Sequence, residues 1–380
     1  MLTMTVSLNI YNKRIAAVKQ RDDIAQKIQE LDAYVRGNFI GTIDEDELLT
    51  SILDGYAAGG SSADLRIDYL TAEEYYEARQ WLAGEIVTSG LQVVRDESGY
   101  MKVTGVYPGS SAAAQGIQPG DIITVVDGFS LLDIGADVAM KRISGEEGTR
   151  LSLTLLHSGE ERKYTLIRST VEIVVVTSTV VNDYGIITIS GYSELTGGHL
   201  AKAIDELSAK HVKGIVFDLR SSVTASDGNI SVPSRTGDIL PVLAEGLNKI
   251  LPPATIAVAE YLDGSTAAIL ETTSEQPLNL PVAVLINGGT SGISELLAAM
   301  LKDFGGAVLV GAQSRGDPVV EKLHPLKDGS AVRVPYARIA SAGFSTFRDG
   351  NGLKPEYEIA AIPGNIDLQL QKALEIIEIR

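Results

Sequence analysis

The sequence predicts a multidomain α/β protein in which an N-terminal helical segment precedes a small β domain and a larger α/β domain. Three patterns indicate this order: apolar residues at helical spacing near the N-terminus, short β-rich runs between glycine turns, and then strands that alternate with helices. A chain of 380 residues fits two to three domains of ordinary size. We expect their boundaries at residues 1–84, 85–168 and 169–380.

Residues 1–84 have the spacing of amphipathic helices. Asp44 with Glu47 and Thr71 with Glu74 form the Asp-x-x-Glu and Thr-x-x-Glu pairs that are typical of helix N-termini. Apolar residues recur every three or four positions in an earlier stretch and would share one helix face: Ile24, Ile28, Leu31 and Val35.

Residues 85–168 read as a compact β domain. Its apolar runs are short, and Pro-Gly and Asp-Gly pairs between them are typical of tight turns. One helical stretch at 134–143 interrupts the strands. The expected strands are Leu91–Val94, Met101–Val106, Ile122–Val126 and Leu151–Leu156.

Residues 169–380 alternate strands with helices, which predicts one α/β sheet covered by helices. Residues 220–238 are rich in Ser, Thr and Asp and read as a long loop. The expected strands are Gly185–Ile189, Gly214–Leu219, Thr255–Val258, Val282–Ile286 and Val308–Val310. The expected helices are His199–Ala209, Ile239–Ile250, Ser294–Asp303 and Leu368–Ile379.

The composition argues against several classes of protein and site. The formal net charge is −17 with a sequence pI near 4.7, and such an acidic surface repels nucleic acids. The chain has no Cys and its four His are well apart, so we expect no disulfide, no metal site and no cofactor. No run of 18 apolar residues occurs. The apolar run 2–10 could be an ordinary strand or the trimmed end of an anchor.

A long ordered motif lies in the middle domain. The segment Ser110–Gly128, SSAAAQGIQPGDIITVVDG, is similar to the PDZ pattern SPAAxAGLxPGDxIxxxDG. Upstream of it, GLQV at residues 90–93 stands where PDZ domains keep their carboxylate-binding loop. The resemblance implies that the middle domain is a PDZ domain.

A second motif lies in the C-terminal half. The segment Asn287–Glu295, NGGTSGISE, is similar to the nucleophile segment NxGSASASE of the C-terminal processing peptidases, the S41 serine peptidases. Segments near Gly306, Pro325 and Gly352 follow this family in order, and Tyr69–Tyr75 resembles its YLTPEEY segment. The resemblance covers about residues 40–380 and implies an S41-type α/β core.

Active members of this family use a Ser–Lys dyad, in which a deprotonated Lys accepts the hydroxyl proton of Ser. The nucleophile position falls on Gly292, and the Lys position, 25 residues later, falls on Asp317. The helper Gln becomes Glu321, and the family's glycine pair after the DLR segment is missing after Arg220. Glycine offers no nucleophile, and a carboxylate cannot replace an amine base. The resemblance therefore implies a pseudopeptidase with no intact catalytic residue.

A relocated nucleophile is an alternative, which would leave an active serine-type endopeptidase. Ser291 and Ser294 flank the lost position at the start of a predicted helix, whose dipole favours an anion. Lys302 or Lys322 could then act as the base. In the other interpretation, Ser291 or Thr290 caps the helix and Ser294 packs against it.

The PDZ resemblance also implies a binding site for protein C-terminal tails. An extended tail would pair with the strand that begins near Leu91, and backbone N–H groups around Gly90 and Leu91 would hold its carboxylate. The groove between this strand and the helix at 134–143 would select the side chains of the tail. The implied peptide-binding residues are Gly90, Leu91, Gln92, Val93, Val138 and Lys141.

The resemblance also suggests partners and a location. Members of the family associate through N-terminal helices and the C-terminal tail, so a homodimer is expected, or a heterodimer with an active relative. Such proteins are exported or membrane-anchored, so an extracytoplasmic location is expected, with membrane contact only through an anchor before Met1. A structural scaffold in an envelope assembly is a third hypothesis, and it differs from the first by predicting no tail binding.

Overall fold

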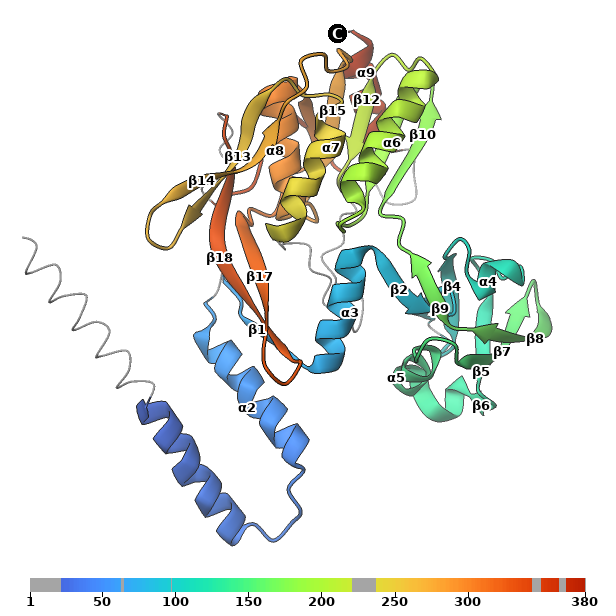
Figure 1. Ribbon diagram of the computed structural model, residues 1–380. Coiled ribbons are helices and arrows are strands. Elements are labelled where there is room, and N and C mark those ends of the chain that lie inside the picture. Colours follow the sequence, from blue (N-terminus) through green and yellow to red (C-terminus); the bar gives the residue numbers. More distant parts are fainter. Residues whose placement is uncertain are drawn as a thin grey trace, which may run out of the picture. The chain divides into compact units, whose positions relative to one another are not determined.

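A computed structural model describes residues 22–62, 65–96, 98–220, 237–343, 350–361 and 367–379 (Figure 1). The apolar run 2–10 and nearly all of the predicted 220–238 loop, including the positions of the missing glycine pair, lie outside the described residues. The chain divides into two compact units, Met1–Tyr56 and Ala57–Arg380. Within the described ranges, no helix combines the length and the apolar character needed to cross a membrane.

The first unit contains one helix over residues 22–38 and most of a second, α2 (Glu45–Gly60). Asp44 caps α2, because its Oδ1 accepts hydrogen bonds from the N–H groups of Asp46 and Glu47 at 3.1 Å each. The predicted amphipathic helix is confirmed, and its apolar stripe is exposed to solvent in this chain. The stripe consists of Ile24, Ile28, Leu31 and Val35.

Residues 91–167 form a six-stranded antiparallel sheet with two helices, and the predicted strands and helix are confirmed. The elements are β3 (Leu91–Arg95), β4 (Met101–Val106), α4 (Ser111–Ala114), β5 (Ile122–Val126), β6 (Phe129–Ser130), α5 (Leu131–Ile143), β7 (Arg150–His157) and β8 (Glu160–Ile167). The strand order is β3-β4-β5-β7-β8 with β6 paired to β5, so β3 lies at an edge. Alternate side chains of these strands pack into one hydrophobic core with α5.

A two-stranded antiparallel ribbon connects this sheet to the rest of the chain. β2 (Glu85–Thr88) leads into the sheet, and β9 (Ser169–Glu172) leads out of it. Arg168, directly before β9, is buried, and its guanidinium donates hydrogen bonds to the carbonyl groups of Arg142 and Ile143. The end of α5 is therefore fixed beside the ribbon.

The C-terminal half contains a second six-stranded sheet between two helix layers. Its elements are β10 (Val176–Val181), β11 (Tyr184–Ile189), α6 (Thr196–Ala209), β12 (Ile215–Asp218), the 3-10 helix η1 (Gly237–Val242), α7 (Leu243–Leu247), β15 (Val282–Ile286), α8 (Ile293–Gly305), β16 (Val308–Gly311), β19 (Tyr357–Glu358) and α9 (Leu368–Glu378). The order is β10-β11-β12-β15-β16-β19, and every pair except β10–β11 is parallel. α6, α7 and α8 pack on one face, and α9 packs on the other (Figure 1).

The remaining strands form a five-stranded antiparallel sheet. They are β1 (Asp68–Leu70), β13 (Ala254–Tyr261), β14 (Thr266–Thr272), β17 (Val319–Pro325) and β18 (Ala331–Ser341). The order is β1-β18-β13-β14, and β17 also pairs with β18. The prediction that Thr255–Val258 joins the helix-covered sheet is wrong, because β13 forms a hairpin with β14 and pairs with β18. α3 (Ala72–Ala83) follows β1, and its predicted Thr71–Glu74 capping box is confirmed.

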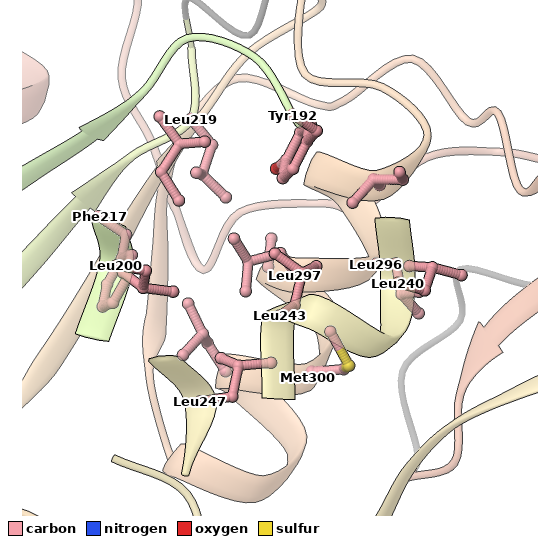
Figure 2. Packing of buried hydrophobic residues seen from close by; sticks show 14 of the residues in the cluster. Tyr192, Leu200, Phe217, Leu219, Leu240, Leu243, Leu247, Leu296, Leu297 and Met300 are labelled. Atoms are coloured by element: carbon pink, nitrogen blue, oxygen red, sulfur yellow. The ribbon is translucent and has the colours of Figure 1, made fainter. Parts of the chain in front are cut away.

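The largest core joins the helix layer of the second sheet to these strands. Figure 2 shows Phe217 and Leu219, at the end of β12, near side chains of α7 and α8 that include Leu243, Leu297 and Met300. All of these side chains are fully buried. Burial of this extent fixes α8, which follows the candidate site, against the sheet.

Two neighbouring glycines at the start of α6 provide a matched test of this packing. A Cβ on Gly197 would overlap the carbonyl oxygen of Val242, whereas the nearest atom to a Cβ on Gly198 is Glu245 Oε2 at 3.5 Å. We expect Gly197→Ala to lower the free energy of unfolding by about 2–4 kcal/mol, because backbone must move. Gly198→Ala should change it by less than about 1 kcal/mol and in the stabilising direction.

Urea unfolding would measure both variants through the fluorescence of the single tryptophan, Trp81, which packs against the same core. Equal effects of the two substitutions would contradict the close contact between α6 and η1.

Candidate functional site

The nucleophile motif forms a tight loop between β15 and α8. The Thr290 hydroxyl accepts a hydrogen bond from the N–H of Asn287 at 3.0 Å and donates one to the carbonyl of Leu219 at 2.9 Å. The loop is thereby tied to the end of β12. Gly292 ends the loop with φ 56° and ψ −118°, a conformation in which a residue with a side chain is strained by about 1–3 kcal/mol.

Glu295, in the first turn of α8, is the centre of the hydrogen bonding at this loop and is fully buried. Its Oε2 accepts from the N–H groups of Gly292 at 3.1 Å and Asp317 at 2.8 Å. Its Oε1 accepts from the N–H of Gly316 at 2.6 Å and from the hydroxyl of Ser314. One carboxylate therefore joins Gly292, the predicted nucleophile position, to Asp317, the predicted Lys position, and it also neutralises the positive end of the α8 dipole.

The segment 350–353 packs directly on the loop that contains position 317. A Cβ on Gly316 would overlap the carbonyl oxygen of Gly350, and a Cβ on Gly352 would overlap the carbonyl oxygen of Ser314. Both glycines have positive φ. The backbone contacts with residues 350–353 and the hydrogen bonds to Glu295 together fix this loop. The fold therefore determines the position of residue 317, whatever side chain that residue carries.

Asp317 and Glu321, which are predicted to stand at the positions of the family's Lys and Gln, are both buried, with exposed fractions of 8 % and 5 %. Glu321 lies on β17, with its Oε2 3.5 Å from the Nε of Arg333 on β18. The same guanidinium binds Asp68 on β1, with Nη2 2.5 Å from Oδ2. The carboxylate at 321 is thus matched by a cation, and Arg333 connects three strands of the antiparallel sheet.

Ser294, one of the two alternative nucleophiles, is fully buried, and its hydroxyl lies 2.7 Å from the phenol oxygen of Tyr192. Burial raises the pKa of Tyr192 far above its usual value. A phenol with a raised pKa stays protonated at neutral pH, so it cannot accept the serine proton. Ser291 is also buried, and its carbonyl accepts the N–H of Ser294 at 3.1 Å. The N-cap of α8 is Gly292 and no side chain caps it, so the prediction that Ser291 or Thr290 caps this helix is wrong.

Neither lysine that could act as the base is bonded to these hydroxyls. Lys302 lies eight positions after Ser294, about 12 Å further along α8, and its Nζ binds Glu356 Oε1 at 2.5 Å. Lys322 is exposed on β17, whereas the serines are buried. Among the residues that the structure describes, no hydrogen bond joins a lysine to Ser291 or Ser294.

The DLR segment beside this loop has a structural role. The guanidinium of Arg220 binds both carboxylate oxygens of Asp218 and both of Asp367, the N-cap of α9, at 2.6–2.9 Å. Arg220 holds the pKa of Asp367 below its usual range. Arg220 therefore fastens the N-terminus of α9 to the end of β12.

The first residue of the predicted tail-binding set, Gly90, is a position that requires glycine. Its φ is 104°, and a Cβ there would overlap the side chain of Ser110. Its N–H already donates to Thr88 Oγ1 at 3.1 Å, and its carbonyl accepts from the N–H of Tyr107 at 2.9 Å. A tail carboxylate would therefore depend on the next N–H along the chain.

Leu91 supplies that N–H at the open edge of β3. It lies opposite Val106, and the bond from the Tyr107 N–H to the Gly90 carbonyl identifies Leu91 and Val106 as a non-hydrogen-bonded pair. The N–H and carbonyl of Leu91 consequently point away from β4. In the described part of the chain, β4 is the only strand paired with β3, so an added strand could use both groups.

The other predicted residues lie on the two elements that flank this edge. Leu91 and Val93 of β3 pack in the same hydrophobic cluster as residues of α5. Val138 on α5 is 44 % exposed, and Gln92 and Lys141 are exposed as well. Five of the six predicted residues therefore lie on two elements that share one core, β3 and α5, and Gly90 directly precedes β3.

Sequence reasoning misses two groups of the candidate site. Glu295 stands in the motif, but no sequence pattern shows which groups it binds. One of its four hydrogen-bond donors is Gly292, and the other three lie in the loop at residues 314–317. Arg333 has no sequence signal at all, because its partners Asp68 and Glu321 are distant along the chain and meet it only through strand pairing.

Two family models match this chain. The model of peptidase family S41 matches residues 234–359, and a PDZ domain model matches residues 102–156. A probable CtpA-like serine protease of Staphylococcus aureus (strain MSSA476) is 24 % identical over 366 residues, which cover 94 % of this chain and 70 % of that protein. A probable CtpA-like serine protease of Staphylococcus epidermidis (strain ATCC 35984) is 23 % identical over 362 residues, with the same coverage.

A solved structure has the same fold. A putative S41 protease from Bacteroides fragilis aligns over 90 % of this chain and 92 % of its own, with a TM-score of 0.52 and 19 % identity. The mixed α/β class predicted from the sequence is confirmed, and so is the resemblance to the family. The two family models and these relatives support the C-terminal processing peptidases of family S41, with a PDZ domain, as the family that this chain resembles.

Proposed function

We propose that this protein binds the C-terminal tails of other proteins through its PDZ domain and does not hydrolyse peptide bonds. The observation that carries the second part is the chemistry of positions 292 and 317. Gly292 offers no nucleophile, and the carboxylate of Asp317 cannot serve as the amine base of a Ser–Lys dyad. Glu295 joins the two loops that hold these positions through four hydrogen bonds, so the fold persists without the groups that would perform the reaction.

An active peptidase with a relocated serine is the second candidate function. Ser294 would need a base, and its hydrogen-bond partner is the protonated phenol of Tyr192. Ser291 and Ser294 are both buried, so a substrate carbonyl could reach them only if the loop opened. These observations favour the inactive protein.

Incubation with an unfolded protein at equal concentration tests this part. We expect carboxymethylated casein to remain intact with the unchanged chain and with the Ser291→Ala/Ser294→Ala double variant, because neither serine has a base. Fragments that appear with the unchanged chain and disappear with the double variant would establish a relocated nucleophile and overturn the proposal.

The tail-binding part is supported by the open edge of β3 and by the exposed apolar side chains of α5. The N–H and carbonyl of Leu91 can pair with an extended tail, which is the strand-addition mode of PDZ domains. Val138 and Leu132 expose apolar surface on α5. An extended tail with an apolar last residue would cover this surface.

Val138→Asp is expected to weaken tail binding about tenfold or more, because it places a carboxylate in the apolar wall and near the tail carboxylate. Val94→Asp is the matched control: Val94 is 48 % exposed, close to the 44 % of Val138, but lies opposite exposed Lys102 on the other face of the sheet. Fluorescence anisotropy with a labelled peptide that ends in an apolar residue measures the affinity of both variants. Equal losses would show that the tail does not bind between β3 and α5.

A dimer and an extracytoplasmic location complete the proposal. The exposed stripe Ile24–Val35 supports a helical partner for the first unit. α9, also expected to contribute, buries Ile376 and Ile377 against its own sheet and so offers less surface. If light scattering of the full chain gave the mass of one copy, that result would contradict the homodimer. Fractionation of cells would test the location.

A further inference from the structure

We propose that the tail groove of this protein prefers tails with an acidic side chain about four residues before the C-terminus, and that Arg95 recognises this side chain. The inference rests on the proposed tail binding and adds its selectivity. It follows from which side of β3 each residue faces and from the charges on the two walls of the groove.

Arg95 lies on the side of β3 that faces the groove. Its partner across the β3–β4 pair is Met101, which is fully buried in the core shared with α5. Residues opposite each other in a sheet project to the same face, so the side chain of Arg95 leaves β3 on that face. Val94 pairs instead with exposed Lys102, on the opposite face.

Arg95 is also available for a ligand. It is exposed, and it forms no ion pair with any residue that the structure describes. The neighbouring carboxylate of Asp96 is used within the turn, where its Oδ1 accepts the N–H of Ser98 at 3.2 Å. Arg95 is the only charged residue of β3.

The opposite wall adds no net charge. α5 carries two acidic residues, Asp133 and Asp137, and two basic ones, Lys141 and Arg142. The formal charges of β3 and α5 together therefore sum to the one positive charge of Arg95, and the Arg142 guanidinium lies over the ring of Phe129. In a chain with a formal net charge of −17, the exposed guanidinium of Arg95 is the group of β3 that can attract an acidic side chain.

The spacing along β3 sets the position of the acidic residue. A tail whose carboxylate lies at the Leu91 N–H runs antiparallel to β3, and each of its residues advances about 3.3 Å. Arg95 is four positions from Leu91, about 13 Å along the strand. Since side chains alternate between faces, the residue four before the C-terminus faces the same side as the last residue and lies beside Arg95.

The groove is long enough for such a tail. A Cβ on Gly99, in the β3–β4 turn, would lie 3.1 Å from Cδ2 of Leu132, so the start of α5 lies beside that turn. Leu132 is exposed there. The α5 wall therefore extends past Arg95 to the far end of β3.

Binding of three labelled peptides to the full chain tests the proposal. The peptides share an apolar last residue and differ only four residues before it, where they carry Glu, Gln or Lys. We expect the Glu peptide to bind about three- to fivefold more tightly than the Gln peptide and the Lys peptide to bind most weakly, which is the range of an exposed ion pair. The difference should shrink in 0.5 M salt.

Arg95→Glu should reverse this order, so that the Lys peptide binds most tightly. Lys102→Glu is the matched control, because it makes the same change of charge on the same hairpin but on the other face of the sheet; it should leave the order unchanged. Circular dichroism of both variants would confirm that the domain stays folded.

The outcomes separate this inference from the proposed function. If none of the peptides binds, and tails of other composition fail as well, tail binding itself is wrong. If the peptides bind but Arg95→Glu leaves their order unchanged, tail binding stands and the selectivity is wrong. Equal effects of Arg95→Glu and Lys102→Glu would show a general charge effect and would also overturn the role of Arg95.

Discussion

Glu295→Ala is expected to lower the free energy of unfolding by at least about 4 kcal/mol. The substitution removes the acceptor of three backbone N–H groups and one hydroxyl, at Gly292, Ser314, Gly316 and Asp317. A buried donor without an acceptor costs about 1–3 kcal/mol, and here four donors lose theirs together. Urea unfolding followed by Trp81 fluorescence measures the change, since Trp81 packs on the same core as α8.

Glu295→Gln refines this prediction, because it keeps the shape of the side chain. Each carboxylate oxygen accepts from two donors, so an amide nitrogen in place of either oxygen would face two donors. We expect about half of the loss seen with alanine. Glu375→Ala is the control, because Glu375 is an exposed helix residue in a surface pair with Lys372 and should cost less than about 1 kcal/mol.

A loss below about 1 kcal/mol for Glu295→Ala would contradict the role assigned to this carboxylate. In that case, water or a rearranged loop would have to satisfy the donors, and the position of residue 317 would not be fixed by the fold. The expected large loss would instead give this part of the motif a structural role that does not depend on the side chains at positions 292 and 317.

Arg333→Ala is expected to lower the free energy of unfolding by about 3–5 kcal/mol. Arg333 is buried between the carboxylates of Asp68 and Glu321, at 2.5 Å and 3.5 Å, and its loss leaves two acidic groups in a site with little water. Removal of one partner of a buried ion pair costs this much because the remaining charge stays buried. Thermal and urea unfolding of the variant measure the change.

Arg66 provides the matched control. It also binds Asp68, at 2.5 Å, but its side chain is 79 % exposed. Arg66→Ala should therefore cost less than about 1 kcal/mol. Adding Glu321→Gln to Arg333→Ala should recover part of the loss, because one of the two buried charges is removed. If Arg333→Ala cost no more than Arg66→Ala, the ion pairs would not hold β1, β17 and β18 together.

The secondary structure of this protein is largely predictable from its sequence, because turns, caps and apolar spacing are local properties. The capping box at Thr71 and the strands of the small β domain follow directly from neighbouring residues. The sheet to which a strand belongs is not local. Thr255–Val258 has the same apolar character as the strands of the helix-covered sheet, yet β13 pairs with β14 and β18 in the other one.

The chemistry at the motif divides in the same way. The residue types at positions 292, 317 and 321 can be read from the sequence, and from them the expected loss of the Ser–Lys dyad follows without any structure. The partners of the alternative nucleophiles cannot be read in this way. Tyr192 is far from Ser294 along the chain, and only the packing of α8 places the phenol at its hydroxyl.

The sequence alone determined the family resemblance, most of the helices and strands, and the residue type at position 292, because each depends on which residues stand next to one another along the chain. The tertiary structure decided which groups are paired: Glu295 with four donors of two loops, Arg333 with Asp68 and Glu321, and Ser294 with Tyr192. The physical reason is distance along the chain. Hydrogen bonds and ion pairs act over a few ångströms in space, and strand pairing and helix packing bring such groups together from positions that no local spacing connects.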